Sequence, residues 1–199
     1  MAQHQTEQLT QPLTFQTLRG LLVAVREAVP ADTSLLAELL GQLSKRTLQL
    51  RYMSARPFST EVIWQEAARM THRHAHDHLT LVATVRRHDS EEAIAVAELV
   101  RDRQTPTAGE IALVVRDDEQ RRGIGSFLLW QLVCAAQRSG VTRLHGNLLA
   151  ENRAVRRLIS TLGLPHTATI SRGEIEAIIY VPAQFEEHAL ARYSKKLAA

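Results

Sequence analysis

Regular hydrophobic patterning begins after Gly20. Residues 21–29 are rich in valine and leucine and end at Pro30, a composition that predicts a first strand closed by a turn. Leucines then recur at helical spacing on one face of a predicted helix, which Asp32 can cap. These leucines are Leu35, Leu36, Leu39, Leu40 and Leu43. A strand followed by an amphipathic helix is therefore expected.

Two more helices are predicted before the pattern changes to strands. A short helix is expected after Ser44, and a longer one from its predicted cap, Ser59, to Met70. Three short runs of valine, isoleucine and leucine follow at hairpin-like spacing, which predicts three antiparallel neighbours. These runs are residues 79–86, 93–101 and 110–115.

The second half of the chain predicts a crossover and a closing hairpin. Residues 123–139 are apolar almost all round, which indicates a helix buried against a sheet, and 141–148 form the next strand. Strands joined through such a helix run parallel. Asn152 is the predicted cap of a further helix, and a hairpin at 165–170 and 174–181 closes the sheet.

Length and composition indicate one globular domain. A chain of 199 residues can form one sizeable core, since domains commonly have roughly 100 to 200 residues. We expect a flexible tail at 1–18, the domain at 19–183, and a tail or helix at 184–199. Hydrophobic residues at 45% and charged residues at 23% argue against disorder.

Several classes of protein are excluded or disfavoured. No apolar run approaches the roughly 18 to 20 residues that span a bilayer, and the glutamine-rich start lacks the features of a signal peptide. We therefore expect a cytoplasmic protein without a membrane partner. A lone cysteine, Cys134, excludes an internal disulfide and the metal-binding cysteine motifs. A net charge of +3 and 5% aromatic residues argue against nucleic-acid binding.

Four alternating histidines are one candidate for a metal site. They are His72, His74, His76 and His78. On an extended segment they would share one face, but structural zinc needs rigid partners. We favour a solvated turn near the entrance for an acceptor and expect no metal.

The segment 113–126 carries the most informative motif. It joins a predicted strand to the buried helix, so backbone N–H groups and the positive end of the helix dipole converge outside the strand. Gly123 and Gly125 leave room for a phosphate beside the backbone, and Arg121 and Arg122 can add charge-assisted hydrogen bonds. A dinucleotide fingerprint lacks its third glycine here, and no Gly-Lys-Ser/Thr follows. A different pyrophosphate ligand is expected.

Gln120-Arg-Arg-Gly-Ile-Gly125 resembles the Q/R-x-x-G-x-G/A motif of the GCN5-related N-acetyltransferases (GNAT), whose ligand is acetyl-CoA. The helix that Asn152 begins is similar to the family's second motif. The turn at 26–32 and Leu50-Arg-Tyr52 resemble bacterial protein-lysine acetyltransferase domains. The resemblance implies an α/β (α+β) GNAT fold, with about six to seven mostly antiparallel strands, flanking helices and a central parallel β-α-β unit that binds acetyl-CoA.

The resemblance also implies the contacts of the cofactor. The strand before the loop would separate from the next parallel strand, so that its backbone pairs with the pantetheine arm and the Val115 N–H lies near the thioester carbonyl. Arg153, Arg156 and Arg157 could reach the 3′-phosphate, with a solvated helix face as the alternative. The implied contact residues are Leu113, Val114, Val115, Gln120, Arg121, Arg122, Gly123, Ile124, Gly125, Ser126 and Asn152.

The implied reaction moves an acyl group from a CoA thioester to a primary amine. A protein lysine is the first candidate, with a polyamine, amino acid or antibiotic amine as alternatives. An amine with a pKa of about 10.4 is mostly protonated at pH 7, so a base is needed. Glu110 stands where the similar protein-lysine acetyltransferases carry their base in a Glu-x-Ala-x-x-Val run, and Glu98 is the alternative. An exposed strand-end carboxylate is the other interpretation of Glu110.

One position departs from the family pattern. Many members carry a tyrosine seven residues after the asparagine as general acid, whereas this chain has Ile159. Tyr52 and Tyr180 are candidate substitutes, with aromatic packing as the alternative for each. A second hypothesis is therefore a CoA-binding sensor or partner-binding domain without catalysis. Either protein is expected to be a monomer or a homodimer.

Overall fold

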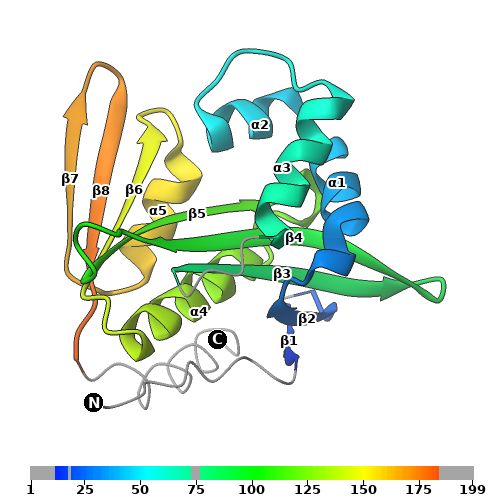
Figure 1. Cartoon of the computed structure of the whole chain (residues 1–199), viewed down its shortest axis with the longest axis horizontal. Helices are drawn as coiled ribbons and strands as arrows, with labels where there is room; N and C mark the ends of the chain where they lie inside the picture. Colours follow the sequence, from blue (N-terminus) through cyan, green and yellow to red (C-terminus); the bar gives the residue numbers. More distant parts are fainter. Residues whose placement is uncertain (1–11, 18, 73–76, 184–199) are drawn as a thin grey trace.

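One mixed sheet forms the centre of the molecule. The computed structural model describes residues 12–17, 19–72 and 77–183, whose eight strands form a sheet in the order β1-β2-β3-β4-β5-β6-β8-β7 (Figure 1). All neighbours are antiparallel except β5 and β6, which run parallel. This topology confirms the expected fold class. The strands are β1 (Leu13–Gln16), β2 (Leu22–Glu27), β3 (His78–Arg87), β4 (Ser90–Arg101), β5 (Ala108–Val115), β6 (Arg143–Leu149), β7 (His166–Ser171) and β8 (Glu174–Tyr180).

The strand β1 was not expected from the sequence. It lies inside the segment 1–18, for which a flexible tail was expected. Its Leu13 stands opposite Val25 of β2. Phe15 is only 9% exposed, and its ring stacks on Phe127 with the ring centroids 4.1 Å apart. Residues 13–16 therefore form a strand and not a tail, because contacts with residues that are distant in the sequence stabilise them. Residues 1–11 and 184–199 lie outside the described residues, so the expected domain limits stay predictions.

Helices cover both faces of the sheet (Figure 1). On one face, α1 and α3 form a core with Val82, Val96 and Val114. On the other face, α4 is buried almost all round, as its sequence predicted. No helix of the described part of the chain is long and apolar enough to cross a membrane. The helices are α1 (Thr33–Gly41), α2 (Lys45–Tyr52), α3 (Thr60–His72), α4 (Ile124–Arg138) and α5 (Arg153–Thr161), with short 3-10 turns η1 (Pro30–Asp32) and η2 (Asp117–Glu119).

Two of the predicted helix caps are confirmed. The Ser59 hydroxyl accepts a hydrogen bond from the Val62 N–H at 3.3 Å, at the start of α3. Ser44, which was not predicted as a cap, accepts one from the Thr47 N–H at 3.1 Å at the start of α2. The Asn152 Oδ1 accepts one from the Val155 N–H at 3.2 Å, at the start of α5. Each side chain thereby satisfies one of the N–H groups that a helix leaves without an internal partner.

The cap predicted at Asp32 is wrong. The Asp32 side chain makes no hydrogen bond to the first turn of α1. Its carboxylate instead accepts two hydrogen bonds from the Arg26 guanidinium, at 2.6 and 2.8 Å, and one from the Val29 N–H at 2.8 Å. A bidentate pair with an arginine is stronger than a neutral hydrogen bond, so Arg26 on β2 decides where this carboxylate points.

The parallel strands β5 and β6 separate soon after they begin. Only residues 108–110 align with 143–145, and the last aligned pair is Glu110 with His145. Directly beyond it, a Cβ on Gly146 would lie 3.1 Å from the Ile111 carbonyl oxygen, so glycine permits the close approach at this point. Residues 111–115 then have no partner on β6. The two strands therefore open into a V-shaped gap.

Candidate functional site

A cavity of about 950 Å³ lies at the gap between β5 and β6. Its walls come from both strands, from the last turn of α2, from the loop that enters α4 and from the first turns of α5. Most of the residues expected to bind a cofactor line it. They are Leu113, Val114, Val115, Gln120, Arg121, Gly123, Gly125, Ser126 and Asn152.

The loop before α4 has the geometry of an anion site. Gly123 occupies the N-cap position of α4 with φ of 91°, a left-handed conformation that favours glycine. The helix therefore begins at the cavity wall, and its first N–H groups have no partner within the helix. Arg121 is exposed beside this turn. N–H groups, helix dipole and guanidinium together favour a phosphate at this end of the cavity.

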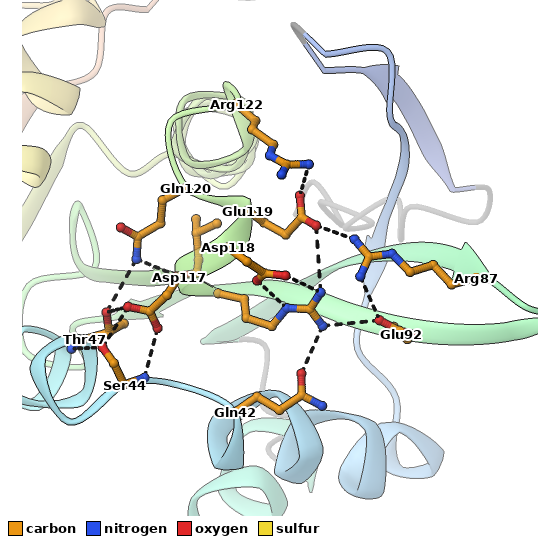
Figure 2. A network of polar contacts seen from close by, with 12 residues as sticks. Gln42, Ser44, Thr47, Arg87, Glu92, Asp117, Asp118, Glu119, Gln120 and Arg122 are labelled. Carbon is orange, nitrogen blue, oxygen red and sulfur yellow. Dashed lines mark hydrogen bonds and ion pairs between the residues drawn. The ribbon is translucent and has the colours of Figure 1, made fainter.

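Two expected contact residues do not line the cavity. Ile124 is fully buried in the core beneath the turn. Arg122 forms an ion pair with Glu119 at 2.9 Å. Glu119 is 1% exposed and also pairs with Arg87 and Arg116 (Figure 2). Arg122 thus helps to neutralise a buried carboxylate of η2, a role that the sequence analysis missed because the burial of Glu119 against Arg87 of β3 depends on the tertiary structure.

Backbone N–H and C=O groups of β5 point into the gap between β5 and β6. The Arg116 N–H donates to the Ile94 carbonyl on β4 at 2.8 Å. Because successive N–H groups of a strand point to opposite edges, those of Leu113 and Val115 point away from β4, towards the gap. The Val115 carbonyl accepts a hydrogen bond from Gln120 Nε2 at 3.0 Å. A ligand with extended amide groups could therefore form backbone hydrogen bonds with β5 at residues 111–115, which have no partner on β6.

Positive charge collects at the α5 side of the cavity. Arg153 and Arg157 line the wall together with Arg121, and none of the three has an ion pair within the described ranges. Arg156, the third arginine of this helix considered from the sequence, does not line the cavity, and its guanidinium donates to the Ala150 carbonyl at 3.4 Å. The unpaired cations suit further anionic groups of a ligand.

Glu110 lies at the opposite end of the cavity. It occupies the last rung that joins β5 to β6, next to the point where the strands separate. Its side chain is exposed, lines the cavity, and has no ion pair among the residues that the structure describes. An unpaired carboxylate at this place can accept a proton from a molecule that enters the cavity.

Glu98 is in a different environment from Glu110. It is 3% exposed, and its carboxylate binds Arg51 at 2.8 Å, Arg69 at 2.9 Å and His78 at 3.0 Å. Burial opposes its charge, but the hydrogen bonds from His78 and Arg69 and the two arginine charges outweigh burial and lower the pKa of Glu98 to about 2. Such a carboxylate is a poor proton acceptor at neutral pH. The structure therefore argues against Glu98 as the base.

Neither candidate tyrosine is placed to act as an acid. Tyr180 is 40% exposed and does not line the cavity. Tyr52 lines the cavity, but its ring packs on Phe58 with centroids 4.6 Å apart. Burial raises the pKa of Tyr52 well above its ordinary value, and the carboxylates of Glu66 and Glu98 act in the same direction. Tyr52 thus fits the packing interpretation, whereas the exposed Tyr180 fits neither interpretation.

The histidine segment is only partly described. His72 is exposed on α3, whereas His78 is buried and bonded to Glu98. His74 and His76 lie outside the described residues, so the role of the 72–78 cluster stays a prediction. Within the described ranges, no group of three or more His, Cys, Asp or Glu side chains is arranged to hold a metal ion.

The wall formed by α2 was missed in the sequence analysis. Thr47 and residues 50–53 line the cavity. Leu50-Arg-Tyr52 was noted only as part of a resemblance. No pattern within α2 indicates a binding role, because its side chains reach the cavity only through the packing of α2 over the gap.

Comparisons with known proteins extend the description of the site. Residues 46–164 match the Acetyltransferase (GNAT) family. The acetyltransferase Pat of Mycolicibacterium smegmatis is 31% identical over 152 residues, which cover 76% of this chain and 44% of that protein. The chain thus spans less than half the length of this curated relative.

Solved structures share the fold. The GNAT domain of S. lividans PAT superposes with a TM-score of 0.72 at 22% identity, covering 85% of this chain and 96% of that one. A variant of the cAMP-binding acyltransferase from Mycobacterium smegmatis superposes with a TM-score of 0.58 at 26% identity, covering 94% of this chain and 54% of that one.

Proposed function

Because the chain belongs to the acetyltransferase (GNAT) family, we propose that it transfers an acetyl group from acetyl-CoA to a primary amine, and that this amine is a protein lysine. One observation carries the proposal: the cavity has an anion-binding turn and arginines at one end and the carboxylate of Glu110 at the other, and neither these arginines nor Glu110 has an ion pair with a residue that the structure describes. This separation of charge suits a phosphate-bearing donor and a cationic acceptor that meet between them.

The donor end of the cavity fits coenzyme A. The first N–H groups of α4 and the Arg121 guanidinium would bind the pyrophosphate. The free backbone edge of β5 at Leu113 and Val115 would pair with the pantetheine amides. The Asn152 Oδ1 is occupied by the cap of α5, whereas its Nδ2 has no partner within the described part of the chain and can donate to the same arm.

The protein supplies a proton acceptor and a hydrogen-bond donor to the reaction. Bound acetyl-CoA supplies an activated acetyl group as a thioester. Glu110, directly or through a water, takes the proton from the ammonium group and thereby makes it a nucleophile. The Val115 N–H donates to the carbonyl oxygen on which negative charge develops. No side-chain acid is needed, because a thiol of pKa about 8.5 leaves as a thiolate at little cost near neutral pH.

Replacing Glu110 tests the proposal. Glu110→Gln keeps the shape of the side chain but removes its basicity, so we expect turnover with a lysine peptide to fall by on the order of a hundredfold or more. Affinity for CoA, measured by isothermal titration, should change little. Glu176→Gln is the matched control, since Glu176 is exposed on β8 and does not line the cavity. Unchanged turnover in Glu110→Gln across the pH range would remove Glu110 from the mechanism.

The second hypothesis is a sensor that binds CoA without catalysis. The observation that favours it is the buried Ile159 at the family's tyrosine position, with neither Tyr52 nor Tyr180 placed to replace it. Isothermal titration of acetyl-CoA, together with thiol release against a panel of lysine peptides and small amines, separates the two hypotheses. Binding without thiol release would favour the sensor.

A further inference from the structure

Asp117, in the turn η2 before the anion-binding loop, is bonded to the first turn of α2. Its Oδ2 accepts a hydrogen bond from the Ser44 N–H at 2.9 Å, and its Oδ1 accepts one from each hydroxyl of Ser44 and Thr47 at 2.7 Å (Figure 2). Three hydrogen bonds to one carboxylate join segments that are about 70 residues apart in the chain. This contact is more than the neutral cap that Ser44 alone would provide.

Gln120 makes a second connection between the loop and α2. Its Nε2 donates to the Val115 carbonyl at 3.0 Å and lies 3.5 Å from the Thr47 hydroxyl (Figure 2). The end of β5, the start of the loop and the start of α2 therefore form one hydrogen-bonded unit. A ligand that orders residues 120–126 acts on a segment bonded directly to α2.

The other end of α2 lines the same cavity. Residues 50–53 form part of its wall, and Arg51 is tied to the buried Glu98 at 2.8 Å. An eight-residue helix is about 12 Å long, and α2 extends along the cavity wall from Thr47, which bonds Asp117, to Tyr52. Both of its ends are held by a carboxylate of another element.

We propose that Asp117 is a positioning residue that couples the anion-binding loop to α2, so that a bound CoA orders the wall against which the amine acceptor binds. The part of this inference that concerns the acceptor rests on the proposed function; the part that concerns α2 and CoA does not. Coupling of this kind typically changes an affinity by a factor of roughly 5 to 150, and it is reciprocal between the two ligands.

Hydrogen exchange of the α2 amides, residues 45–52, measures the coupling without turnover. In the unmodified protein, saturating CoA is expected to slow exchange in α2 at least fivefold, and in Asp117→Asn this effect is lost. Asp118→Asn is the matched control: Asp118 lies in the same turn but bonds Arg116, at 2.7 and 3.1 Å, and not α2. The control should retain the CoA effect. Thr47→Val tests the same contact from the α2 side if Asp117→Asn fails to fold.

Each outcome of the exchange experiment has one meaning. If CoA binds the unmodified protein by isothermal titration but leaves exchange in α2 unchanged, the coupling does not exist. An equal loss of the effect in Asp117→Asn and Asp118→Asn would mean that the whole turn, and not the Asp117 contact, transmits it, which also overturns the proposal. Failure of CoA to bind the folded protein would instead overturn the proposed function and, with it, the coupling.

Steady-state kinetics provide the second readout. In Asp117→Asn we expect the KM for a lysine peptide to rise at least fivefold, while kcat and the Kd for CoA in the absence of peptide, measured by isothermal titration, change less than twofold. A merely structural role would lower the amount of active enzyme, and so would lower kcat without this selective change. A uniform loss of kcat with the KM for the peptide unchanged contradicts the positioning role.

Discussion

Glu98 and Glu119, together with Asp32, are the buried acidic residues among those that the structure describes. Glu98 is 3% exposed and Glu119 is 1% exposed, and each is surrounded by arginines. An ionised carboxylate in such a place is tolerated only when opposite charges and hydrogen bonds compensate for its lost hydration. Glu98 thereby connects α2 and α3 to the sheet, and Glu119 connects the loop before α4 to β3.

Removing the charge of Glu98 should destabilise the protein at neutral pH. Glu98→Gln leaves Arg51 without its anion and Arg69 with Glu66 alone, and we expect the free energy of unfolding to fall by about 3 kcal/mol at pH 7. Guanidinium denaturation followed by tryptophan fluorescence measures the change. Glu38→Gln, at an exposed position of α1, is the control and should have little effect.

The same variant should show a weaker dependence of stability on pH. The folded-state pKa of Glu98, about 2, is lower than the ordinary value of 4.5, so its contribution is complete above about pH 4.5 and is lost as the pH falls towards 2. The difference in stability between the unmodified protein and Glu98→Gln should therefore shrink between pH 5 and pH 2.5. A constant difference over this range would show that the charge of Glu98 does not contribute.

At the scale of the elements, the start of α4 depends on one backbone conformation. Gly123 has φ of 91°, which costs a residue with a side chain about 1 to 2 kcal/mol. The turn directs the first N–H groups of α4 at the cavity, so its geometry and its binding role are set together. A glycine elsewhere in a helix carries no such requirement.

Two alanine substitutions should have opposite effects on stability. Gly123→Ala is expected to lower the free energy of unfolding by about 1 to 2 kcal/mol because of its left-handed backbone. Gly41→Ala, in the last turn of α1 where a Cβ would meet nothing within 4 Å, should leave stability unchanged or raise it by up to about 1 kcal/mol. Chemical denaturation of both variants measures the difference. Equal effects would mean that the conformation at Gly123 is not strained for alanine.

At the scale of the whole molecule, the sheet depends on contacts between distant segments. β1 is joined to the rest by its pairing with β2 and by the stacking of Phe15 on Phe127 of α4. The edge strand and the central helix thus share one core. A strand of four residues would not persist without these contacts.

Truncation of the Phe15 ring should therefore affect the entire fold. Phe15→Ala is expected to lower the free energy of unfolding by about 3 kcal/mol, because it removes a buried ring and leaves a cavity beside Phe127. Leu22→Ala, at a neighbouring position that is 63% exposed, should change it by less than about 0.5 kcal/mol. Thermal unfolding followed by circular dichroism compares the two. Equal melting temperatures for both variants would contradict a structural role for β1.

Local patterns in the sequence determined most of the elements and part of the site. The leucine spacing of α1, the apolar α4, the caps at Ser59 and Asn152 and the turn at Gly123 depend on interactions between residues close in the chain. Periodicity and turn chemistry therefore reveal them. The position of Glu110 near the start of the strand that leads into the loop also followed from the order of the elements.

Contacts between distant segments were decided only by the tertiary structure. The strand at 13–16 needs β2 and α4, the charge of Glu98 needs arginines from α2 and α3, and the buried Glu119 needs Arg87 of β3. Likewise, Asp117 meets α2 only after the chain has folded back over the gap between β5 and β6. A local sequence pattern does not reveal such partners, because the distance between two residues along the chain is unrelated to their distance in space.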